Sequence, residues 1–216
     1  MALFISFEGG EGCGKSTQIA ALAARLTSRG MPVLATREPG GCAIADAIRL
    51  ILLDPTNAAL VPRAELLLYA AARAQHVDEI IRPALGQDTW VLCDRFTDAT
   101  VAYQGGGRQL PPTTIETLNR IATDGLQPDL TLLLDLPVEE GLRRAIGRNH
   151  KNGTIHEGRF EAETLAFHQR VRAAYRQLAD SHKRFRVVDA SGDVAGIAGR
   201  IDGVLAEFLA GRGIQP

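Results

Sequence analysis

A glycine-rich stretch near the start of the chain carries the clearest chemical signal. Residues 9–16 read GGEGCGKS, which fits the phosphate-loop pattern GxxxxGK[ST] in full. The glycines let backbone N–H groups converge on an anion, and a helix starting near Lys15 adds the positive end of its dipole. We therefore expect a bound nucleoside triphosphate, with Lys15 at the β- and γ-phosphates and Ser16 on Mg²⁺. The residues expected at the phosphates are Gly9, Gly10, Glu11, Gly12, Cys13, Gly14, Lys15, Ser16 and Thr17.

Glu11 places a negative charge inside this anion-binding loop. Because the backbone N–H groups bind the phosphates, the side chain is free to point outward, toward a second ligand. A carboxylate accepts hydrogen bonds from neutral groups such as hydroxyls. A solvated loop glutamate is the simpler alternative.

Arginines follow two of the predicted strands. Arg37 comes directly after PVLAT, and Asp94 and Arg95 come after WVLC. Ligands of open α/β sheets bind beyond the carboxyl ends of the strands, and guanidinium groups suit bidentate phosphate binding. The pattern favours a second phosphate site beside the loop. The alternatives are a solvated turn arginine for Arg37 and a structural ion pair for Asp94 and Arg95.

A polar, glycine-punctuated stretch at residues 147–161 predicts a surface-mobile lid. This stretch and the helix before it contain Arg144, Arg148 and Arg159. An arginine delivered to a transferring phosphoryl group accelerates the reaction by about 10³–10⁵, and a closed lid excludes water. A solvated basic loop is the alternative.

Tyr69 and Arg73 lie four residues apart, on one face of a predicted helix. Such a pair could stack on a nucleobase and hydrogen-bond to it. A core tyrosine next to a surface arginine explains the spacing equally well.

The elements that position these residues alternate along the chain. Short apolar runs at 3–7, 32–36, 90–94, 130–135 and 184–189 predict buried parallel strands. Helical spacing occurs at 16–28, 44–53, 64–85, 113–122, 138–148, 160–179 and 194–210, while residues 102–112, rich in glycine and proline, predict a loop. Strand alternating with helix indicates an α/β doubly wound fold with a parallel sheet. We expect one domain over residues 1–216.

Composition excludes several classes of function. The formal net charge of −1 gives no general attraction to nucleic acid or to an anionic membrane. No apolar run reaches the roughly 18 residues of a membrane span, and the opening MALFISFEGG lacks the basic residues and apolar length expected of a signal peptide. Three scattered cysteines predict neither a disulfide framework nor a zinc site, so we expect a cytoplasmic protein. A guanine-reading NKxD segment is also missing, which disfavours a non-catalytic nucleotide switch.

The order of motifs resembles bacterial thymidylate kinases over essentially the whole chain. The matching stretches are FEGGEGCGKST, TREPGG, LLLYAAARAQH, DRFTDATVAYQGGGR, PDLTLLLD and GRFE. The resemblance implies a P-loop NTPase fold with a five-stranded parallel sheet. It also implies ATP-dependent phosphorylation of dTMP to dTDP with Mg²⁺, and a homodimer. A related kinase with another nucleotide or nucleoside as acceptor remains the alternative.

The resemblance also assigns roles at the acceptor and the metal. Arg37 and Arg95 would hold the phosphate of dTMP, while Asp94, with Glu8, would organise Mg²⁺ through water. The implied nucleoside contacts are Tyr69 stacked on thymine, Arg73 at a base carbonyl, Thr100 and Gln104 at the thymine edge, Tyr103 beside C2′ and Glu11 near the 3′-hydroxyl.

Members of this family carry their catalytic arginine either in the phosphate loop or on the lid. The loop interior here has no arginine, so the resemblance assigns the role to Arg159 in GRFE, with Arg144 and Arg148 on the ATP side. Lys15, Arg95 and Asp94 complete the implied catalytic set. Gly158 stands where the family usually has Asp, and the lid is longer than in close relatives, so the lid contacts stay open.

Overall fold

Five parallel strands form the centre of the molecule. The structure is a computed structural model that describes residues 2–152 and 158–213. Its strands are β1 (Phe4–Glu8), β2 (Val33–Arg37), β3 (Trp90–Asp94), β4 (Leu130–Asp135) and β5 (Phe185–Asp189), in the order β2-β3-β1-β4-β5. All neighbours pair in parallel, so the predicted five-stranded parallel sheet is confirmed.

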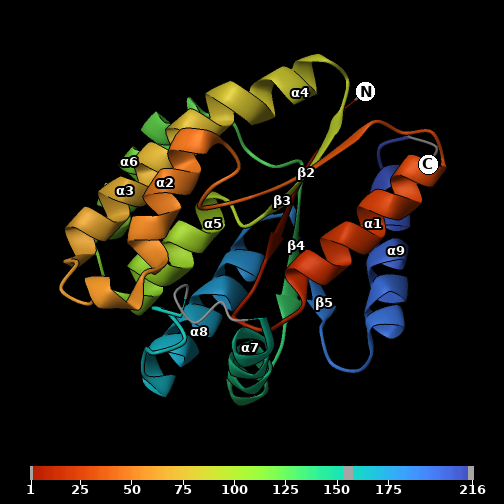
Figure 1. Ribbon diagram of the computed structural model, residues 1–216. Helices are drawn as coiled ribbons and strands as arrows, with labels where there is room; N and C mark the ends of the chain where they lie inside the picture. Colours follow the sequence, from red (N-terminus) through yellow and green to blue (C-terminus); the bar gives the residue numbers. More distant parts are fainter. Residues whose placement is uncertain (1, 153–157, 214–216) are drawn as a thin grey trace.

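Helices cover both faces of this sheet (Figure 1). The α-helices are α1 (Lys15–Ser28), α2 (Ala43–Leu53), α3 (Pro62–His76), α4 (Arg82–Gly86), α5 (Thr97–Thr100), α6 (Pro112–Thr123), α7 (Val138–Asn152), α8 (Leu165–Ser181) and α9 (Val194–Ala210). Val77–Ile81 and Val101–Gly107 are π-helical, and Pro55–Asn57 forms a short 3₁₀ turn.

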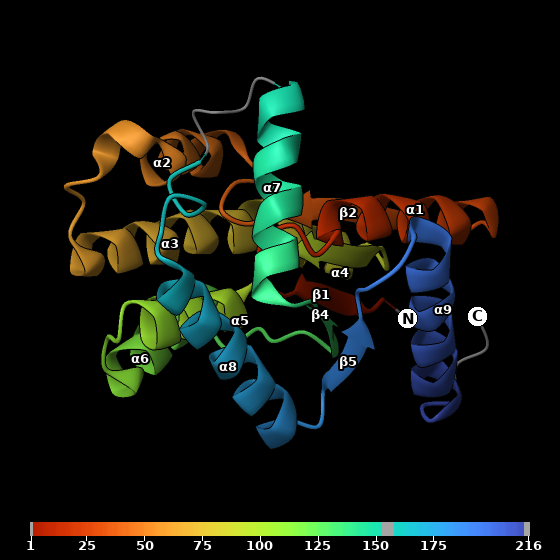
Figure 2. The same cartoon turned by 90° about the horizontal axis from the view of Figure 1, so that it is seen from below.

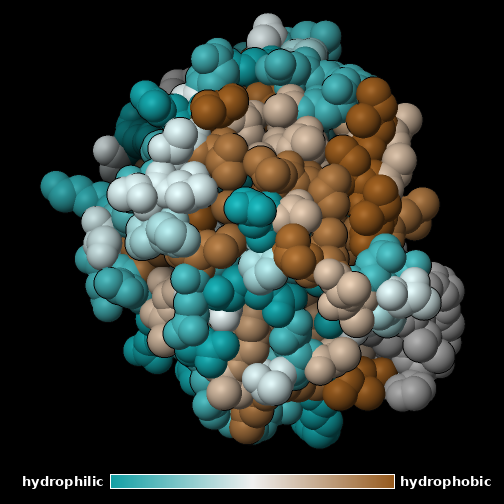
Figure 3. Space-filling view, turned by 90° about the vertical axis from the view of Figure 1, so that its left-hand side faces the viewer, coloured by the Kyte–Doolittle hydropathy of each residue, from teal (hydrophilic) through white to brown (hydrophobic). Residues whose placement is uncertain are grey.

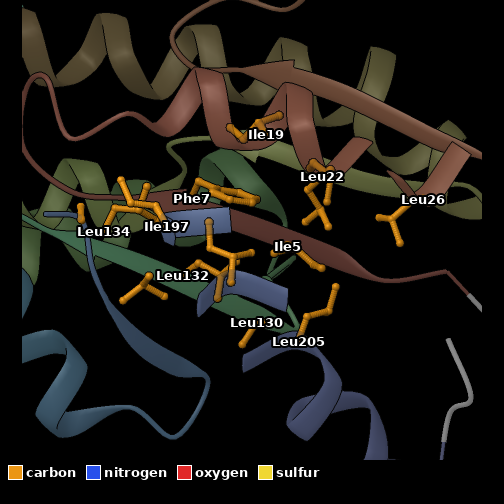
Figure 4. Close-up of a cluster of buried hydrophobic side chains, with 14 of the residues drawn as sticks. Ile5, Phe7, Ile19, Leu22, Leu26, Leu130, Leu132, Leu134, Ile197 and Leu205 are labelled. Atoms are coloured by element: carbon orange, nitrogen blue, oxygen red, sulfur yellow. The ribbon is translucent and has the colours of Figure 1, made fainter. Parts of the chain in front are cut away.

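The largest core cluster lies between the sheet and helices α1 and α9. Alternation along β1 sends Ile5 and Phe7 to this face, where they meet Leu22 of α1 and Ile201 of α9. Figure 4 shows side chains from β1, β4, α1 and α9 converging in this layer. The other side chains of β1 face the opposite way, where Phe4 packs with Phe96, Val77 and Ile81. That second face carries the polar site.

Only residues 108–111 of the segment 102–112 form the loop that its composition predicts. Val101–Gly107 forms a π-helix that continues α5. Its glycines permit close packing against α8 instead of a turn. A Cβ on Gly106 would lie 2.7 Å from Ala174 Cβ, and one on Gly107 would lie 2.4 Å from the Phe167 ring. Glycine composition alone does not separate these two uses.

Part of the segment predicted as a lid, residues 147–161, falls within the described structure. Helix α7 continues to Asn152, past the predicted start of the lid at residue 147. Residues 153–157 lie outside the described part of the chain. Arg159 and Phe160 are buried where we expected a mobile surface. Both pack on the side of the molecule that carries the cavity described below. Helix α8 begins at Leu165 and not at Phe160, since the Thr164 hydroxyl accepts the Phe167 N–H as an N-cap.

Within the described residues, every helix is too short or too polar to cross a lipid bilayer.

Candidate active site

A cavity of about 370 Å³ opens at the carboxyl edge of the sheet, between the phosphate loop and helix α3. Figure 2 looks onto this edge from below, with α7 crossing its centre. The register aligns Arg37 with Asp94 and Asp94 with Phe7, so β1, β2 and β3 end together here. The predicted residues that line the cavity are Glu11, Gly12, Gly14, Lys15, Ser16, Thr17, Arg37, Tyr69, Arg73, Asp94, Arg95, Thr100, Tyr103 and Gln104.

The phosphate loop has the backbone that its glycines predict. Gly14 has φ 91° at the N-cap of α1, in the left-handed region that favours glycine. Lys15 Nζ donates to the carbonyls of Gly9 at 3.2 Å and Gly10 at 2.9 Å. Gly12 lies against Gly141 of α7, whose carbonyl oxygen would stand 2.0 Å from a Cβ on Gly12. Helix α7, which leads to the lid, therefore packs directly on the loop.

Ser16 and Asp94 form an oxygen pair suited to Mg²⁺. Ser16 Oγ donates to Asp94 Oδ2 at 2.7 Å, and both residues line the cavity. In phosphoryl-transfer sites Mg²⁺ takes only one or two protein oxygens and completes its shell with phosphate and water. The described residues contain no group of three His, Cys, Asp or Glu side chains that could hold a metal.

The hydrogen bonds of Glu8 lead away from this pair, so its expected part in organising Mg²⁺ through water stays a prediction. Glu8 is fully buried, and its two oxygens accept the Phe96 N–H at 2.7 Å and the Tyr175 hydroxyl at 2.7 Å. Burial raises the pKa of Glu8 to about 8, with the nearby Asp98 charge adding to the rise.

Arg95 is the centre of the polar network in the cavity. Its backbone has φ 70°, a left-handed conformation that costs a non-glycine residue about 1–3 kcal/mol and is concentrated at functional sites. Its guanidinium donates to the Gly9 carbonyl at 2.9 Å, to Glu11 at 2.9 Å and to the hydroxyls of Tyr103 and Tyr175. The arginine thus connects β3, the phosphate loop and α8.

Glu11 faces the cavity and is not solvated in the manner of a surface glutamate. The Tyr103 hydroxyl donates to Glu11 Oε1 at 2.7 Å, beside the Arg95 contact. Burial raises the pKa of Glu11, but the charges of Arg95 and Lys15 outweigh it and hold that pKa at about 2. The loop carboxylate is therefore ionised and oriented toward the acceptor side.

Arg73 is buried, which excludes the alternative of a surface arginine. Its Nε donates to Glu38 at 2.7 Å, one terminal nitrogen donates to Thr100 at 2.9 Å, and the other donates to the Phe96 carbonyl at 3.0 Å. His76 contacts the second oxygen of Glu38 at 3.1 Å. These contacts fix the guanidinium at the cavity wall.

Tyr69 lies one turn before Arg73 on α3 and lines the same wall. Its ring centre is 6.4 Å from that of Phe160. Among the described residues its hydroxyl has no hydrogen-bond partner. Burial raises the pKa of Tyr69, with the Glu65 carboxylate adding to the rise.

Arg37 and Arg49 form the outer, more exposed cationic side. The Arg37 side chain is 56% exposed and lies 3.6 Å from Asp46. Arg49, which sequence reasoning missed, donates to the Pro39 carbonyl at 2.9 Å and lines the cavity. Arg49 follows Asp46 by about one turn of α2, and this spacing is the sequence signal that could have revealed it.

Of the lid and ATP-side arginines, the structure describes two. Arg159 does not line the cavity; it pairs with the buried Glu65 at 2.7 Å and donates to the Leu52 carbonyl. Arg144 on α7 pairs with Glu140. The side chain of Arg148 lies outside the described part of the chain.

Glu65 and Tyr175 are the other residues that sequence reasoning missed. Glu65 precedes Tyr69 and Arg73 by one and two helical turns, so the same spacing could have revealed it. Tyr175 gave no such signal, because it reaches the site from α8 across 167 residues of sequence to contact Glu8.

The fold and the loop together define a P-loop nucleotide-binding protein, in which one cavity runs from the phosphate loop to the polar wall on α3. The thymidylate kinase family matches residues 7–201. The thymidylate kinase of Geotalea daltonii is 60% identical over 196 residues, covering 90% of this chain and 92% of that protein. The thymidylate kinase of Trichlorobacter lovleyi is 58% identical over 209 residues, covering 96% and 99%. The chain belongs to the thymidylate kinase family.

Proposed function

We propose a role for each residue of the cavity in the reaction of a dTMP kinase. Membership of the thymidylate kinase family makes this chain such an enzyme. Such an enzyme phosphorylates dTMP to dTDP with ATP as donor and Mg²⁺ as cofactor. One observation carries the division of roles. A single cavity runs from Lys15 and Ser16 on the phosphate loop to Tyr69, Arg73 and Gln104 on the opposite wall. Donor and acceptor phosphates can therefore meet in line.

On the donor side, the loop backbone from Gly9 to Thr17 binds the phosphates of ATP. Lys15 neutralises the β- and γ-phosphates. Ser16 would ligate Mg²⁺ and Asp94 would organise the ion through water, and the ion would shield the charge on the transferring group. We assign Arg144 and Arg148 to the ATP side, because they occur on α7, which packs on the loop at Gly12.

On the acceptor side, Arg37 and Arg95 bind the phosphate of dTMP. Arg95 is oriented for this role by four hydrogen-bond partners, while Arg37 is more exposed. Tyr69 stacks on thymine, and Arg73, Thr100 and Gln104 contact its edge. Tyr103 lies beside C2′ of the sugar, and Glu11 accepts from its 3′-hydroxyl.

Arg159 supplies the remaining positive charge on the transferring phosphoryl group. The loop interior has no arginine, and Arg159 is held beside the acceptor wall by Glu65. Catalysis then requires its guanidinium to leave Glu65 and reach the γ-phosphate. We propose that the 216 residues work as one domain with this lid at about 147–161.

We also propose that the chain is a cytoplasmic homodimer. The cysteines are all free and buried, which suits a reducing compartment. Exposed apolar side chains gather on the face formed by α2, α3 and α6, which we call the apolar face, and Figure 3 shows them in brown. It comprises Ile44, Leu50, Ile51, Val61, Leu67 and Ile121. A contiguous patch of this kind marks an interface, and a second copy of the chain is its proposed occupant.

The acceptor is tested with a coupled assay of ADP release. With ATP and Mg²⁺ fixed, we expect dTMP to give a much higher kcat/KM than dUMP, UMP, CMP, AMP or thymidine. No acceleration by dTMP above background ATP hydrolysis would contradict the function. Preference for another monophosphate would move the chain to a different acceptor, and ATP binding without turnover would indicate a switch.

A further inference from the structure

Gln104 uses only one end of its side-chain amide. Its Nε2 donates to Glu65 Oε1 at 2.7 Å, while its Oε1 has no partner among the residues that the structure describes. The residue is 1% exposed and lines the cavity. An amide oxygen without a partner, on an enclosed residue at a cavity, is a group available to a ligand.

The contact with Glu65 determines which end of the Gln104 amide is free. A carboxylate can only accept hydrogen bonds, so the NH₂ end of Gln104 must face it and the oxygen must point the other way. Glu65 itself is fully buried and ion-paired with Arg108 at 3.1 Å and Arg159 at 2.7 Å. The two guanidinium groups keep the carboxylate in place.

The neighbouring groups on the same wall are donors. The Arg73 guanidinium donates to Thr100 Oγ1, so the hydroxyl hydrogen of Thr100 points elsewhere, and no described residue accepts it. The wall therefore offers a ligand one acceptor, Gln104 Oε1, next to a donor. A pyrimidine edge that matches this pattern has an N–H beside a carbonyl.

We propose that Glu65 is a specificity-determining positioning residue: it fixes the Gln104 oxygen toward the base and so selects pyrimidines that carry an N3–H. Thymine and uracil have this hydrogen next to a carbonyl at C4. Cytosine has a bare N3 acceptor next to an amino group, and both would oppose the groups on the wall. The inference rests on the proposed placement of the base beside Gln104.

The test compares kcat/KM for dTMP and dCMP in wild type and Glu65→Gln. The amide in the variant can donate as well as accept, so Gln104 is free to turn round. We expect the dTMP-to-dCMP ratio to fall at least ~10-fold, because rejection by mismatched buried polar groups is large. A loss of activity that is equal for both nucleotides would show a merely structural role and overturn the inference.

Glu163→Gln is the matched control. Glu163 also pairs with Arg108, at 2.6 Å, but it has no hydrogen bond to Gln104. Like Glu65→Gln, the Glu163→Gln substitution removes a negative charge beside Arg108. We expect its dTMP-to-dCMP ratio to stay at the wild-type value. An equal change of the ratio in Glu163→Gln would assign the effect to Arg108 and overturn the inference.

Two further variants keep the test decisive. Gln104→Leu removes the amide, and an unchanged dTMP-to-dCMP ratio in this variant would refute the placement of the base beside Gln104. If the ratio changes in Gln104→Leu but not in folded Glu65→Gln, only the role of Glu65 is refuted. Glu65→Asp keeps the negative charge between the arginines but withdraws it from Gln104 by one methylene. If thermal unfolding shows that Glu65→Gln does not fold, Glu65→Asp decides, and an unchanged ratio in it would overturn the inference.

Discussion

Arg95 lies between the phosphate loop and the proposed acceptor site, and Glu11 holds it there. Arg95 binds the loop carbonyl of Gly9 and the loop carboxylate of Glu11, yet it also faces the acceptor cavity. The Glu11 charge holds the guanidinium in place without occupying the anion sites formed by backbone N–H groups. An acidic residue inside a phosphate loop is therefore consistent with anion binding, because its charge is directed at an arginine.

Arg159→Ala should separate binding from catalysis. We expect kcat to fall by about 10³ or more, since a lost arginine finger removes charge stabilisation of the transition state, while the Kd of dTMP changes little. Steady-state kinetics and calorimetric titration measure the two quantities. Arg108→Ala removes the other arginine from Glu65 and should lower kcat far less. Wild-type turnover in Arg159→Ala would refute the assignment.

Glu8→Gln should change how stability depends on pH. The pKa of Glu8 is about 8 in the folded protein against 4.5 normally, so the folded state holds this proton more tightly. The free energy of unfolding therefore falls as pH rises from about 4.5 to about 8, by up to about 1.4 kcal/mol per pH unit, and levels off above. Glutamine cannot ionise, so the variant loses this contribution.

Urea unfolding between pH 5 and pH 8.5 measures the effect. The difference between wild type and Glu8→Gln should shift steadily in favour of the variant as pH rises. Glu207→Gln, on the exposed side of α9, is the control for exchanging a carboxylate for an amide. A pH-independent difference would mean that Glu8 is ionised throughout.

At the scale of elements, the π-helix Val101–Gly107 and helix α8 are packed too closely to admit a side chain between them. A Cβ on Gly106 would meet Ala174 Cβ at 2.7 Å and the Arg170 carbonyl oxygen at 3.1 Å, and neither can move independently of α8. Tyr103 and Gln104 occur on the same π-helix. Packing between these two elements therefore sets the position of the acceptor wall.

Gly106→Ala should destabilise the protein by about 1–3 kcal/mol, the usual cost of overpacking, and raise the KM for dTMP. Gly199→Ala on α9 is the matched control, because a Cβ there meets nothing within 4 Å. That control should stabilise the helix by about 0.5–1 kcal/mol. Denaturant unfolding and initial rates measure both variants, and equal stability of the two would contradict the packing argument.

At the scale of the whole molecule, the cavity and the apolar face share helices. Helix α3 carries Tyr69 and Arg73 on one side and the 51%-exposed Leu67 on the other. Pairing of two copies through this face would hold α2 and α3 against each other and so support the acceptor wall. Assembly and substrate affinity should then be linked.

Leu67→Glu should convert the dimer to a monomer, because burying a charge in an apolar interface is strongly unfavourable. Sedimentation velocity should give twice the chain mass for wild type and the single-chain mass for the variant. Val194→Glu, an equally exposed apolar position outside this face, should leave the mass unchanged. A wild-type protein that stays monomeric at micromolar concentration would refute the dimer.

The local pattern of the chain determined the phosphate loop and the parallel sheet, and it predicted arginines at the strand ends. The glycines, Lys15 and Ser16 work through neighbouring backbone, and buried parallel strands appear as consecutive apolar runs, so both are local signals. Arg37 and Arg95 followed from the rule that ligands bind at strand ends. Each of these features depends on residues close in sequence.

Only the tertiary structure decided which polar groups meet. Glu8 and Tyr175 are 167 residues apart, and it is the burial created by the fold that raises the pKa of Glu8. The glycines of the π-helix were misread because close packing on α8 and a flexible loop use the same residue. Glu65 acquires its role only where α3, the π-helix and Arg159 come together. Hydrogen bonding and desolvation depend on the environment of a group, which the fold creates and a local pattern does not contain.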